Sequence, residues 1–314
     1  MSGITFNAQT PNCLLDASIY IFRYYFSLPD NWFSDEGYPS AAVHGYSQFL
    51  LNFLRTQKPA KIAACFDESL GSCFRNEIYP DYKSSRELPD EALAFQLNAC
   101  REVTEILGVP SYSSSVYEAD DLLGSLLTHL QASDEQNSDP SAIAILTRDK
   151  DLGQLILREQ DFLWDYVNPV KQERMARADI HQKFGVWPEQ LVDYLGLVGD
   201  AVDDIPGVPG VGAKTAQALL QWGGDIENIF GQIDAIEKLP FRGAKTLGQK
   251  LEDNLELLVM SRSLAQIITD ADMGLDDNSL TRKRPDAEAF DDFCRRMGFG
   301  APIGKSFNLL MEHL

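Results

Sequence analysis

Acidic residues follow three short apolar runs of this sequence, and their positions indicate a cation site. The runs lie at 13–15, 62–66 and 142–146, and the acidic residues that come after them are Asp16, Asp67, Asp149 and Asp151. Short apolar runs bounded by turn residues are typical of buried parallel strands. The carboxyl ends of such strands meet at one edge of a sheet, where α/β proteins place their sites. Carboxylates crowded there would repel one another unless a cation neutralised them, and oxygen ligands in this number favour Mg²⁺ or Mn²⁺.

Two further acidic groups have a spacing of three residues. Glu118 and Asp121 would share a face at the start of a helix, and Asp120 is expected to point toward the strand ends. Asp200 and Asp203 repeat this spacing beside another turn. An acidic first turn is also explained by the helix macrodipole alone. Taken together with the acids that follow the strands, however, the pattern favours metal binding.

The glycine-rich segment PGVPGVGAKT at 206–215 is expected to form a hairpin between two helices. Its spacing is G-x-x-G-x-G and no strand-like run precedes it, so it does not match the dinucleotide-binding pattern G-x-G-x-x-G. A hairpin followed by a helix from Lys214 would expose backbone N–H groups to a phosphate without reading bases. The alternative is an ordinary corner between two helices, in which Gly and Pro are equally common.

Aromatic and basic residues are interleaved in the segment YPDYKSSR at 79–86. Aromatic rings stack on unpaired bases, and Lys or Arg side chains bind phosphate. The segment is therefore a candidate contact for single-stranded nucleic acid, with an ordinary solvated loop as the alternative.

Helical stretches alternate with the strand-like runs over the first two-thirds of the chain, which predicts a parallel sheet flanked by helices. Helices are expected after Asp16 and at about 41–55, 90–107 and 118–129. From about residue 187 the pattern is mostly helical, including 188–198 and 216–222. An α/β core followed by a helical part is the expected organisation.

The composition is that of a globular protein of 314 residues with a formal net charge of −20. No apolar stretch is long enough to span a membrane, and the first residues do not resemble a signal peptide. The five cysteines are scattered without a C-x-x-C pair, which favours reduced thiols in a cytoplasmic protein. The charge argues against nucleic acid, although carboxylates that bind metal ions would account for part of it. Any DNA binding is expected to be weak and sensitive to salt.

Taken in order, the motifs resemble those of the 5′→3′ exonuclease and flap endonuclease family, which includes the 5′-nuclease domain of bacterial DNA polymerase I. The matching residues are 15–18, 66–67, 74–75, 82–83 with Arg86, 118–121, 147–152, 199–207 and 210–215. Weak similarity continues to the end of the chain, and no polymerase accompanies it, so a free-standing nuclease is expected.

The resemblance implies a PIN-like parallel-sheet core at 1–185, with a helical arch at about 72–107, and a mostly helical region at 186–314. A helix–hairpin–helix motif for duplex DNA would lie at about 190–222. The implied activity is structure-specific hydrolysis of DNA phosphodiesters from 5′ ends and 5′ flaps by two Mg²⁺ ions, with Mn²⁺ as a substitute. The implied partner is DNA with a 5′ end or flap beside a duplex, without a membrane or a small-molecule cofactor.

The resemblance also implies roles for individual residues. One metal site would use Asp67, Glu118, Asp120 and Asp121 with Asp16 and Asp149 nearby, and a second would use Asp151, Asp200 and Asp203. The catalytic residues would be Lys83 and Arg86 at the scissile phosphate, with Asp120 and Asp149. DNA contacts are implied for Arg75, Tyr82, Lys83, Arg86, Gly207, Gly210, Gly212, Lys214 and Thr215. Backbone carbonyls near Val208 and Val211 resemble those that hold K⁺ in relatives.

The sequence departs from the family pattern at two positions, with Ala17 in place of a frequent Gly and Asp204 in place of a common Asn. Two other functions are alternatives. A PIN-type endoribonuclease would share the acidic core but would not need the hairpin or the arch. A DNA-junction binding protein with a decayed site would lack some of the carboxylates, and all of them are present here. A phosphatase is disfavoured because Ser18 stands where an Asp-x-Asp nucleophile motif would have its second Asp.

Overall fold

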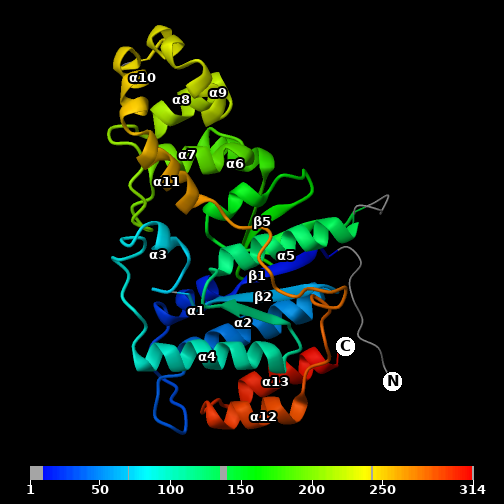
Figure 1. Ribbon diagram of the computed structural model, residues 1–314. Coiled ribbons are helices and arrows are strands. Elements are labelled where there is room, and N and C mark those ends of the chain that lie inside the picture. The colour runs from blue at the N-terminus through cyan, green and yellow to red at the C-terminus, as the bar shows by residue number, and fades with distance from the viewer. Residues whose placement is uncertain (1–9, 70, 135–139, 242, 313–314) are drawn as a thin grey trace.

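The protein is described by a computed structural model that covers residues 10–69, 71–134, 140–241 and 243–312. Within these residues six strands form one sheet in the order β3-β2-β1-β4-β5-β6, shown in Figure 1. The strands are β1 Asn12–Asp16, β2 Ile62–Asp67, β3 Ser111–Ser114, β4 Ile143–Leu146, β5 Phe162–Tyr166 and β6 Gln172–Ala176. All neighbours are parallel except β5 and β6. The expected parallel sheet is confirmed.

The strand order reverses at β1, which pairs with β2 on one side and β4 on the other. In the register, Asp16 lies opposite Cys65 of β2, and Leu15 lies opposite Leu146 of β4. The carboxyl ends of β1, β2 and β4 therefore meet at one edge. In open α/β sheets, this reversal leaves a crevice between the helices that follow the diverging strands.

Both faces of the sheet are covered at its centre, which explains why β1, β2 and β4 are mostly apolar without alternation. In β1, Cys13 and Leu15 pack into the core on one face, whereas Leu14 packs into the core on the other. The first face is covered by α1 Ala17–Tyr25, α2 Ala41–Gln57 and α4 Glu91–Ile106, with α12 Ala287–Arg296 packed on α4 and α13 Ala301–Met311 packed on α2. The second face is covered by α5 Ala119–Asp134. The short helices α3 Arg75–Ile78 and α6 Arg177–Phe184 complete this half.

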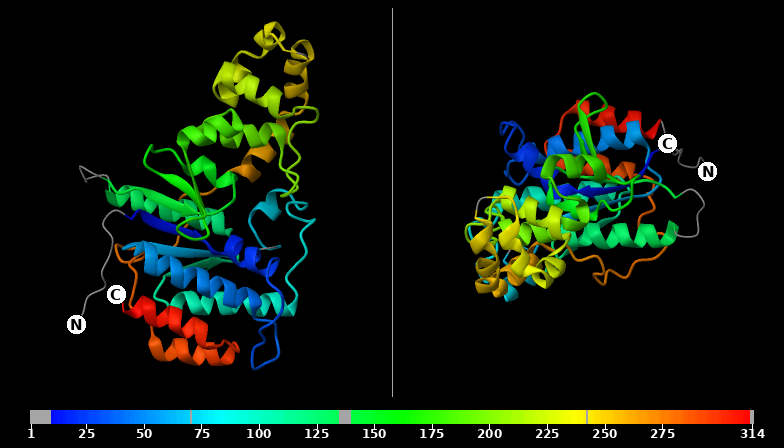
Figure 2. Two further views of the ribbon diagram at one scale, coloured as in Figure 1. Left: turned by 180° about the vertical axis from the view of Figure 1, so that it is seen from behind. Right: turned by 90° about the horizontal axis from the view of Figure 1, so that it is seen from above.

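A helical region follows the sheet and stands away from it in the two side views (Figure 1 and Figure 2, left). Its helices are η2 Pro188–Gln190, α7 Leu191–Val198, α8 Ala213–Gly223, α9 Ile226–Gly231, η3 Ile233–Lys238, α10 Ala244–Asp253 and α11 Leu255–Ala265. Helix α7 packs against α8 and α11, which fixes the hairpin between α7 and α8. None of the helices in the described parts of the chain combines the length and the apolar character needed to cross a membrane.

The expected single helical part at 186–314 is divided in space. After α11, the chain returns across the core, where Ile268 N–H donates to Asp121 and Thr281 forms a bridge with Lys61. Helices α12 and α13 then pack below α4 and α2, on the side of the sheet away from the helical region (Figure 1). They belong to the α/β core.

The predicted helices lie close to their observed positions, but the arch is only partly helical. Helix α4 matches the prediction for 90–107, whereas 79–90 contains turns and bends rather than helix. Pro80 and Pro89 within that stretch lack an N–H donor and constrain the residues before them, which accounts for the interruption.

Candidate active site

Asp16 occupies the position where β1 passes into α1. Its side chain caps the helix, because one carboxylate oxygen accepts from the N–H of Ile19 at 3.3 Å. The other oxygen accepts from the hydroxyl of Thr147, the residue after β4, at 2.8 Å. A helix cap and the neighbouring strand thus orient this buried carboxylate.

Asp149 and Asp151 are held by the turn that follows β4. The N–H of Asp149 donates to Thr147 Oγ1 at 2.9 Å, and the N–H of Asp151 donates to Asp149 Oδ1 at 2.9 Å. The 3₁₀ helix η1 Asp151–Leu155 starts at this point. Asp151 Oδ1 is buried and has no hydrogen-bond partner. A buried oxygen without a donor favours a cation beside it.

Asp67 ends β2, next to β1. Its N–H donates to Ser18 Oγ at 3.0 Å, and its carboxylate accepts from Ser69 Oγ at 3.1 Å. Ser18 lies in the first turn of α1, so the β1–α1 junction positions both Asp16 and Asp67. The acids at the ends of the strands predicted that Asp16 and Asp67 lie near each other. They did not predict that the hydroxyl of Ser18 binds the backbone of Asp67.

Asp121 is engaged differently from the other predicted metal ligands. It accepts from Arg75 Nη1 at 2.7 Å and Nη2 at 2.8 Å, and from the backbone N–H groups of Glu118 and Ile268. The side chain is fully buried and both oxygens are used. In this structure Asp121 therefore has the geometry of a structural ion pair, and its role as a metal ligand stays a prediction.

Arg75 is 2 % exposed and cannot reach a DNA phosphate in this arrangement. Besides Asp121, it donates to Glu118 and to the carbonyl oxygens of Leu264 and Gln266 at the end of α11. Tyr82 is 4 % exposed and donates to Glu118 Oε2 at 2.8 Å. The predicted phosphate contact of Arg75 and base stacking of Tyr82 are both corrected, because the two side chains are buried supports of the site.

Lys83 and Arg86 do reach the carboxylates. Lys83 Nζ lies 2.5 Å from Glu118 Oε1 and 3.5 Å from Asp203 Oδ2, and Arg86 forms an ion pair with Asp203. The N–H of Lys83 also donates to the carbonyl of Asp203, and the N–H of Ser85 donates to Asp204 Oδ2. The loop at 82–86 is therefore docked on the loop at 200–205.

The predicted hairpin lies between α7 and α8. Gly207 adopts a φ of +63°, and a Cβ there would lie 2.3 Å from the backbone nitrogen of Gly199, so only glycine fits. Gly207 is buried and its N–H donates to Ser261 Oγ, which corrects its assignment as a DNA contact. The other predicted contacts in the hairpin have surface positions, with Gly210, Gly212 and Lys214 exposed and Thr215 partly exposed.

The valines of the hairpin are buried and fix its shape. The N–H of Val208 donates to the Leu197 carbonyl, and the N–H of Val211 donates to the Val208 carbonyl. Asp200, at the entrance to the hairpin, pairs with Lys150 at 3.2 Å. Sequence reasoning assigned no role to Lys150, although its position between Asp149 and Asp151 was a signal.

The electrostatics divide the carboxylates into two groups. Burial, with the charge of Asp149 as a further cause, raises the pKa of Asp16 and of Asp151 to about 7. Burial and neighbouring carboxylates also raise the pKa values of Asp120 and Asp149. Glu118 differs, because burial would raise its pKa but Lys83 and Arg75 lower it overall.

Asp16, Asp120, Asp149 and Asp151 form no salt bridge within the described part of the chain, so this uncompensated group fits a divalent cation. As the side chains stand, no group of three or more His, Cys, Asp or Glu residues among those described could hold a metal ion. One reason is visible in the ion pairs, since Lys83 lies between Glu118 and Asp203, and Lys150 lies beside Asp200.

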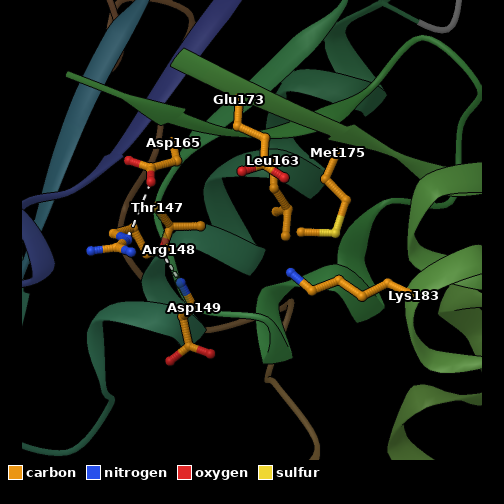
Figure 3. Close-up of a pocket in the computed structure, with 8 residues that line it drawn as sticks. All are labelled: Thr147, Arg148, Asp149, Leu163, Asp165, Glu173, Met175 and Lys183. Atoms are coloured by element: carbon orange, nitrogen blue, oxygen red, sulfur yellow. Dashed lines mark hydrogen bonds and ion pairs between the residues drawn. The ribbon is translucent and has the colours of Figure 1, made fainter. Parts of the chain in front are cut away.

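A cavity of about 130 Å³ adjoins the site beyond Asp149 (Figure 3). Arg148 lines it and pairs with Asp165 at 3.2 Å, while Lys183 reaches toward it from α6 (Figure 3). Sequence reasoning missed these charged residues because β5 and β6, which bring Asp165 and Glu173 to the cavity wall, were not predicted as individual strands.

Comparison with known proteins gives two family models that together match most of the chain. They are the 5′-3′ exonuclease, N-terminal resolvase-like domain at residues 11–185 and the 5′-3′ exonuclease, C-terminal SAM fold at residues 186–288. DNA polymerase I of Pseudomonas aeruginosa is 36 % identical over 293 residues, covering 93 % of this chain but 31 % of that protein. The 5′-3′ exonuclease of Buchnera aphidicola subsp. Schizaphis graminum is 34 % identical, covering 89 % of this chain and 93 % of that protein.

Solved structures agree with this fold. T5 5′-exonuclease with bound divalent metal ions (zinc) aligns with a TM-score of 0.64 and 17 % identity, covering 95 % of this chain and 99 % of that one. The catalytic core of Rad2 in complex with DNA substrate aligns with a TM-score of 0.63 and 17 % identity, covering 98 % of this chain and 92 % of that one. The chain thus spans about a third of the polymerase relative and nearly the full length of the separate exonuclease and of T5 5′-exonuclease.

Proposed function

The chain belongs to the 5′-3′ exonuclease family, and on that premise we propose that it hydrolyses DNA phosphodiesters at 5′ ends and 5′ flaps with the help of divalent cations. The observation that supports this most is the uncompensated group Asp16, Asp120, Asp149 and Asp151, which lies beneath the cationic loop of Lys83 and Arg86. Buried anions without salt bridges of their own, near the cations of Lys83 and Arg86, suit a site that receives both a metal ion and a phosphate.

We propose Mg²⁺ as the resident ion, with Mn²⁺ as a substitute. Asp16, Asp67, Glu118, Asp120 and Asp149 would hold one ion, and Asp151, Asp200 and Asp203 would hold a second. When bound, such ions supply an activated water and stabilise the charge on the leaving oxygen. Asp121 is left out of this set because Arg75 occupies both of its oxygens.

Lys83 and Arg86 would act on the phosphate. In the present arrangement they neutralise Glu118 and Asp203. An ion on those carboxylates would replace this compensation and leave both cations available to the scissile phosphate. A preorganised donor directed at charge that develops in the transition state typically contributes about 10²-fold or more in rate.

The hairpin would bind the duplex beside the cleaved strand. Gly210, Gly212 and Lys214 are exposed at the amino end of α8, where free N–H groups and the helix dipole favour a phosphate. We propose that K⁺ binds the backbone carbonyls near Val208 and Val211. Contacts of this kind recognise the shape of the DNA rather than its sequence.

The decisive experiment uses a 5′-labelled flap duplex incubated with Mg²⁺, Mn²⁺ or EDTA. The wild type is expected to cleave near the flap junction with either ion and not in EDTA. Asp120→Asn should cleave the flap about 10²-fold more slowly or worse, which is the loss seen when other groups that stabilise a transition state are removed. Asp272→Asn, an identical change at an exposed carboxylate, is the matched control and should retain full activity.

Three other outcomes would contradict the proposal. Cleavage that persists in EDTA would rule out the metal mechanism. Equal cleavage of unstructured RNA and flap DNA would favour a PIN-type endoribonuclease. Tight binding of the flap without cleavage in any ion would favour a DNA-junction binding protein.

A further inference from the structure

A cavity of about 220 Å³ opens beside Asp67, at the carboxyl end of β2. Its walls are largely apolar, with Phe66 from the strand and Ala94 and Leu97 from the first turns of α4, and Ser18 of α1 also lines it. Leu88 and Pro89, from the part of the arch that descends to α4, form the rim. Leu88 is 69 % exposed, so its side chain is accessible at this rim.

The cavity lies on the far side of the carboxylates from the hairpin. Asp200 of the hairpin entrance pairs with Lys150, which follows β4, whereas Asp67 ends β2, on the other side of β1. In Figure 1 the helical region with α7 and α8 is above the sheet, and α4 is below it. A strand that leaves a duplex bound at the hairpin and crosses the carboxylates would therefore arrive at this cavity.

The size and chemistry of the cavity suit one nucleobase. Pockets for drug-sized ligands span roughly 300–1,000 Å³, so this smaller cavity fits one ring system rather than a whole nucleotide. Its apolar walls would contact the faces of a ring. Asn98 and the carboxylate of Glu68 at its edge can accept hydrogen bonds from exocyclic amino groups. The Glu68 carboxylate disfavours an anionic ligand inside the cavity.

We propose that this cavity, lined by Phe66, Leu88, Pro89, Ala94 and Leu97, binds the base of one unpaired nucleotide next to the scissile phosphate. The proposal deepens the nuclease function proposed above and rests on it. Binding of this base would fix the position of the phosphate relative to the carboxylates, so the base would contribute to the choice of the bond that is cut. Contact with ring faces is tolerant of sequence, which agrees with recognition by shape.

The test is an abasic scan of the flap strand, read by affinity and by cleavage. Flap duplexes that carry one abasic residue at successive positions around the junction are compared with the intact flap. Affinity is measured by fluorescence anisotropy in EDTA, and kcat/KM is measured in Mg²⁺. An abasic residue at one position is expected to reduce the affinity of the wild type about five- to tenfold, which is the lower end of the contribution of a stacked base. At that position the cut site should move, or several neighbouring bonds should be cut.

Ala94→Phe fills the cavity, so we expect it to bind the intact flap with an affinity reduced by the same factor. Removal of the critical base should then cause no further loss of affinity in this variant. Ala132→Phe adds the same side chain at an exposed position near the far end of α5 and should behave as the wild type. Leu88→Ser, at the exposed rim, should give a smaller loss without affecting stability. Thermal unfolding followed by circular dichroism verifies that each variant is folded.

The inference and the proposed function fail in different ways. If the wild type does not cleave the intact flap, the nuclease proposal itself is wrong. If it cleaves normally but no single abasic position reduces its affinity, or if Ala94→Phe retains the wild-type sensitivity to the missing base, the cavity does not bind a base.

Discussion

Each carboxylate of the site is defined by what surrounds it rather than by its residue type. Asp121 is bound by a guanidinium on both oxygens, whereas Asp151 keeps one buried oxygen without any partner. Asp16 lies between these cases, because a helix N–H and a threonine hydroxyl orient it without neutralising it. The unneutralised carboxylates are the ones expected to respond to pH and to metal ions.

The stability of the metal-free protein should depend on pH through Asp151. Burial, followed by the charge of Asp149, raises its pKa from 3.8 to about 7. The folded state then holds this proton more tightly than the unfolded state, so the stability contribution declines as the pH rises from about 4 to about 7. Asp151→Asn cannot ionise. In EDTA, its stability relative to the wild type should increase across this window, as measured by urea unfolding at a series of pH values.

At pH 7 and above, Mg²⁺ should make the wild type more stable than Asp151→Asn, because a bound ion stabilises the ionised carboxylate of the wild type. Asp272→Asn, which removes an exposed carboxylate, serves as the control and should show no such trend. A difference between Asp151→Asn and the wild type that is constant with pH would contradict the raised pKa.

Among the elements, the most important junction joins α3, α5 and the end of α11. Arg75 of α3 donates to Glu118 and Asp121 at the start of α5, and to the carbonyls of Leu264 and Gln266. One side chain thereby links the base of the arch, the acidic helix and the helical region. The loop at 82–86 begins only a few residues after α3, so the position of Lys83 depends on this junction.

Arg75→Ala should destabilise the protein strongly, because it leaves the Asp121 charge buried and unpaired. Breaking a buried pair in this way costs about 3–5 kcal/mol. Arg75→Lys keeps the charge but loses the bidentate geometry, so an intermediate loss is expected. The free energy of unfolding in urea provides the measurement. Arg295→Ala, which removes an exposed partner of Asp292, is the matched control with an expected change of about 0–1 kcal/mol. A loss below about 1 kcal/mol for Arg75→Ala would show that the junction is not maintained by this residue.

At the scale of the whole molecule, the end of the chain returns to the core instead of continuing the helical region. Phe307 of α13 stacks on Phe290 of α12 with ring centroids 4.2 Å apart, and both rings are buried in the core that includes α2 and α4. In the sequence, parts of the same core thus come both before and after the helical region. The two halves of the chain are expected to unfold together.

Phe307→Ala should therefore lower global stability while leaving the site intact. Truncation of a buried Phe costs about 3–5 kcal/mol. Urea unfolding should show this loss in a single transition, and flap cleavage at low temperature should remain at the wild-type rate. Leu309→Ala, at a side chain that is 45 % exposed on the same helix, should change stability by no more than roughly 0.5 kcal/mol. Loss of cleavage by folded Phe307→Ala would mean that α13 contributes to the site directly.

The sequence by itself determined the three central strands β1, β2 and β4 and the meeting of the acids that follow them. Apolar runs that are buried on both faces can only be central strands, and their period places Asp16, Asp67 and Asp149 at one edge. The hairpin at 206–212 was also predictable, because Gly207 and Gly210 adopt positive φ angles that other residues avoid. These features depend on local pattern and spacing.

Only the tertiary structure decided which charges are partners. Arg75 meets Asp121 from 46 residues away, and the carbonyl of Gln266 from 191 residues away. A basic residue in a polar segment gives no local signal of such contacts, so Arg75 and Tyr82 were predicted at a DNA surface although they are buried. The cavity beside Asp67 likewise requires β2, the arch and α4 to be assembled. The acids that could bind an ion are visible in the sequence, but their individual roles follow from the cations and cavities that long-range packing brings beside them.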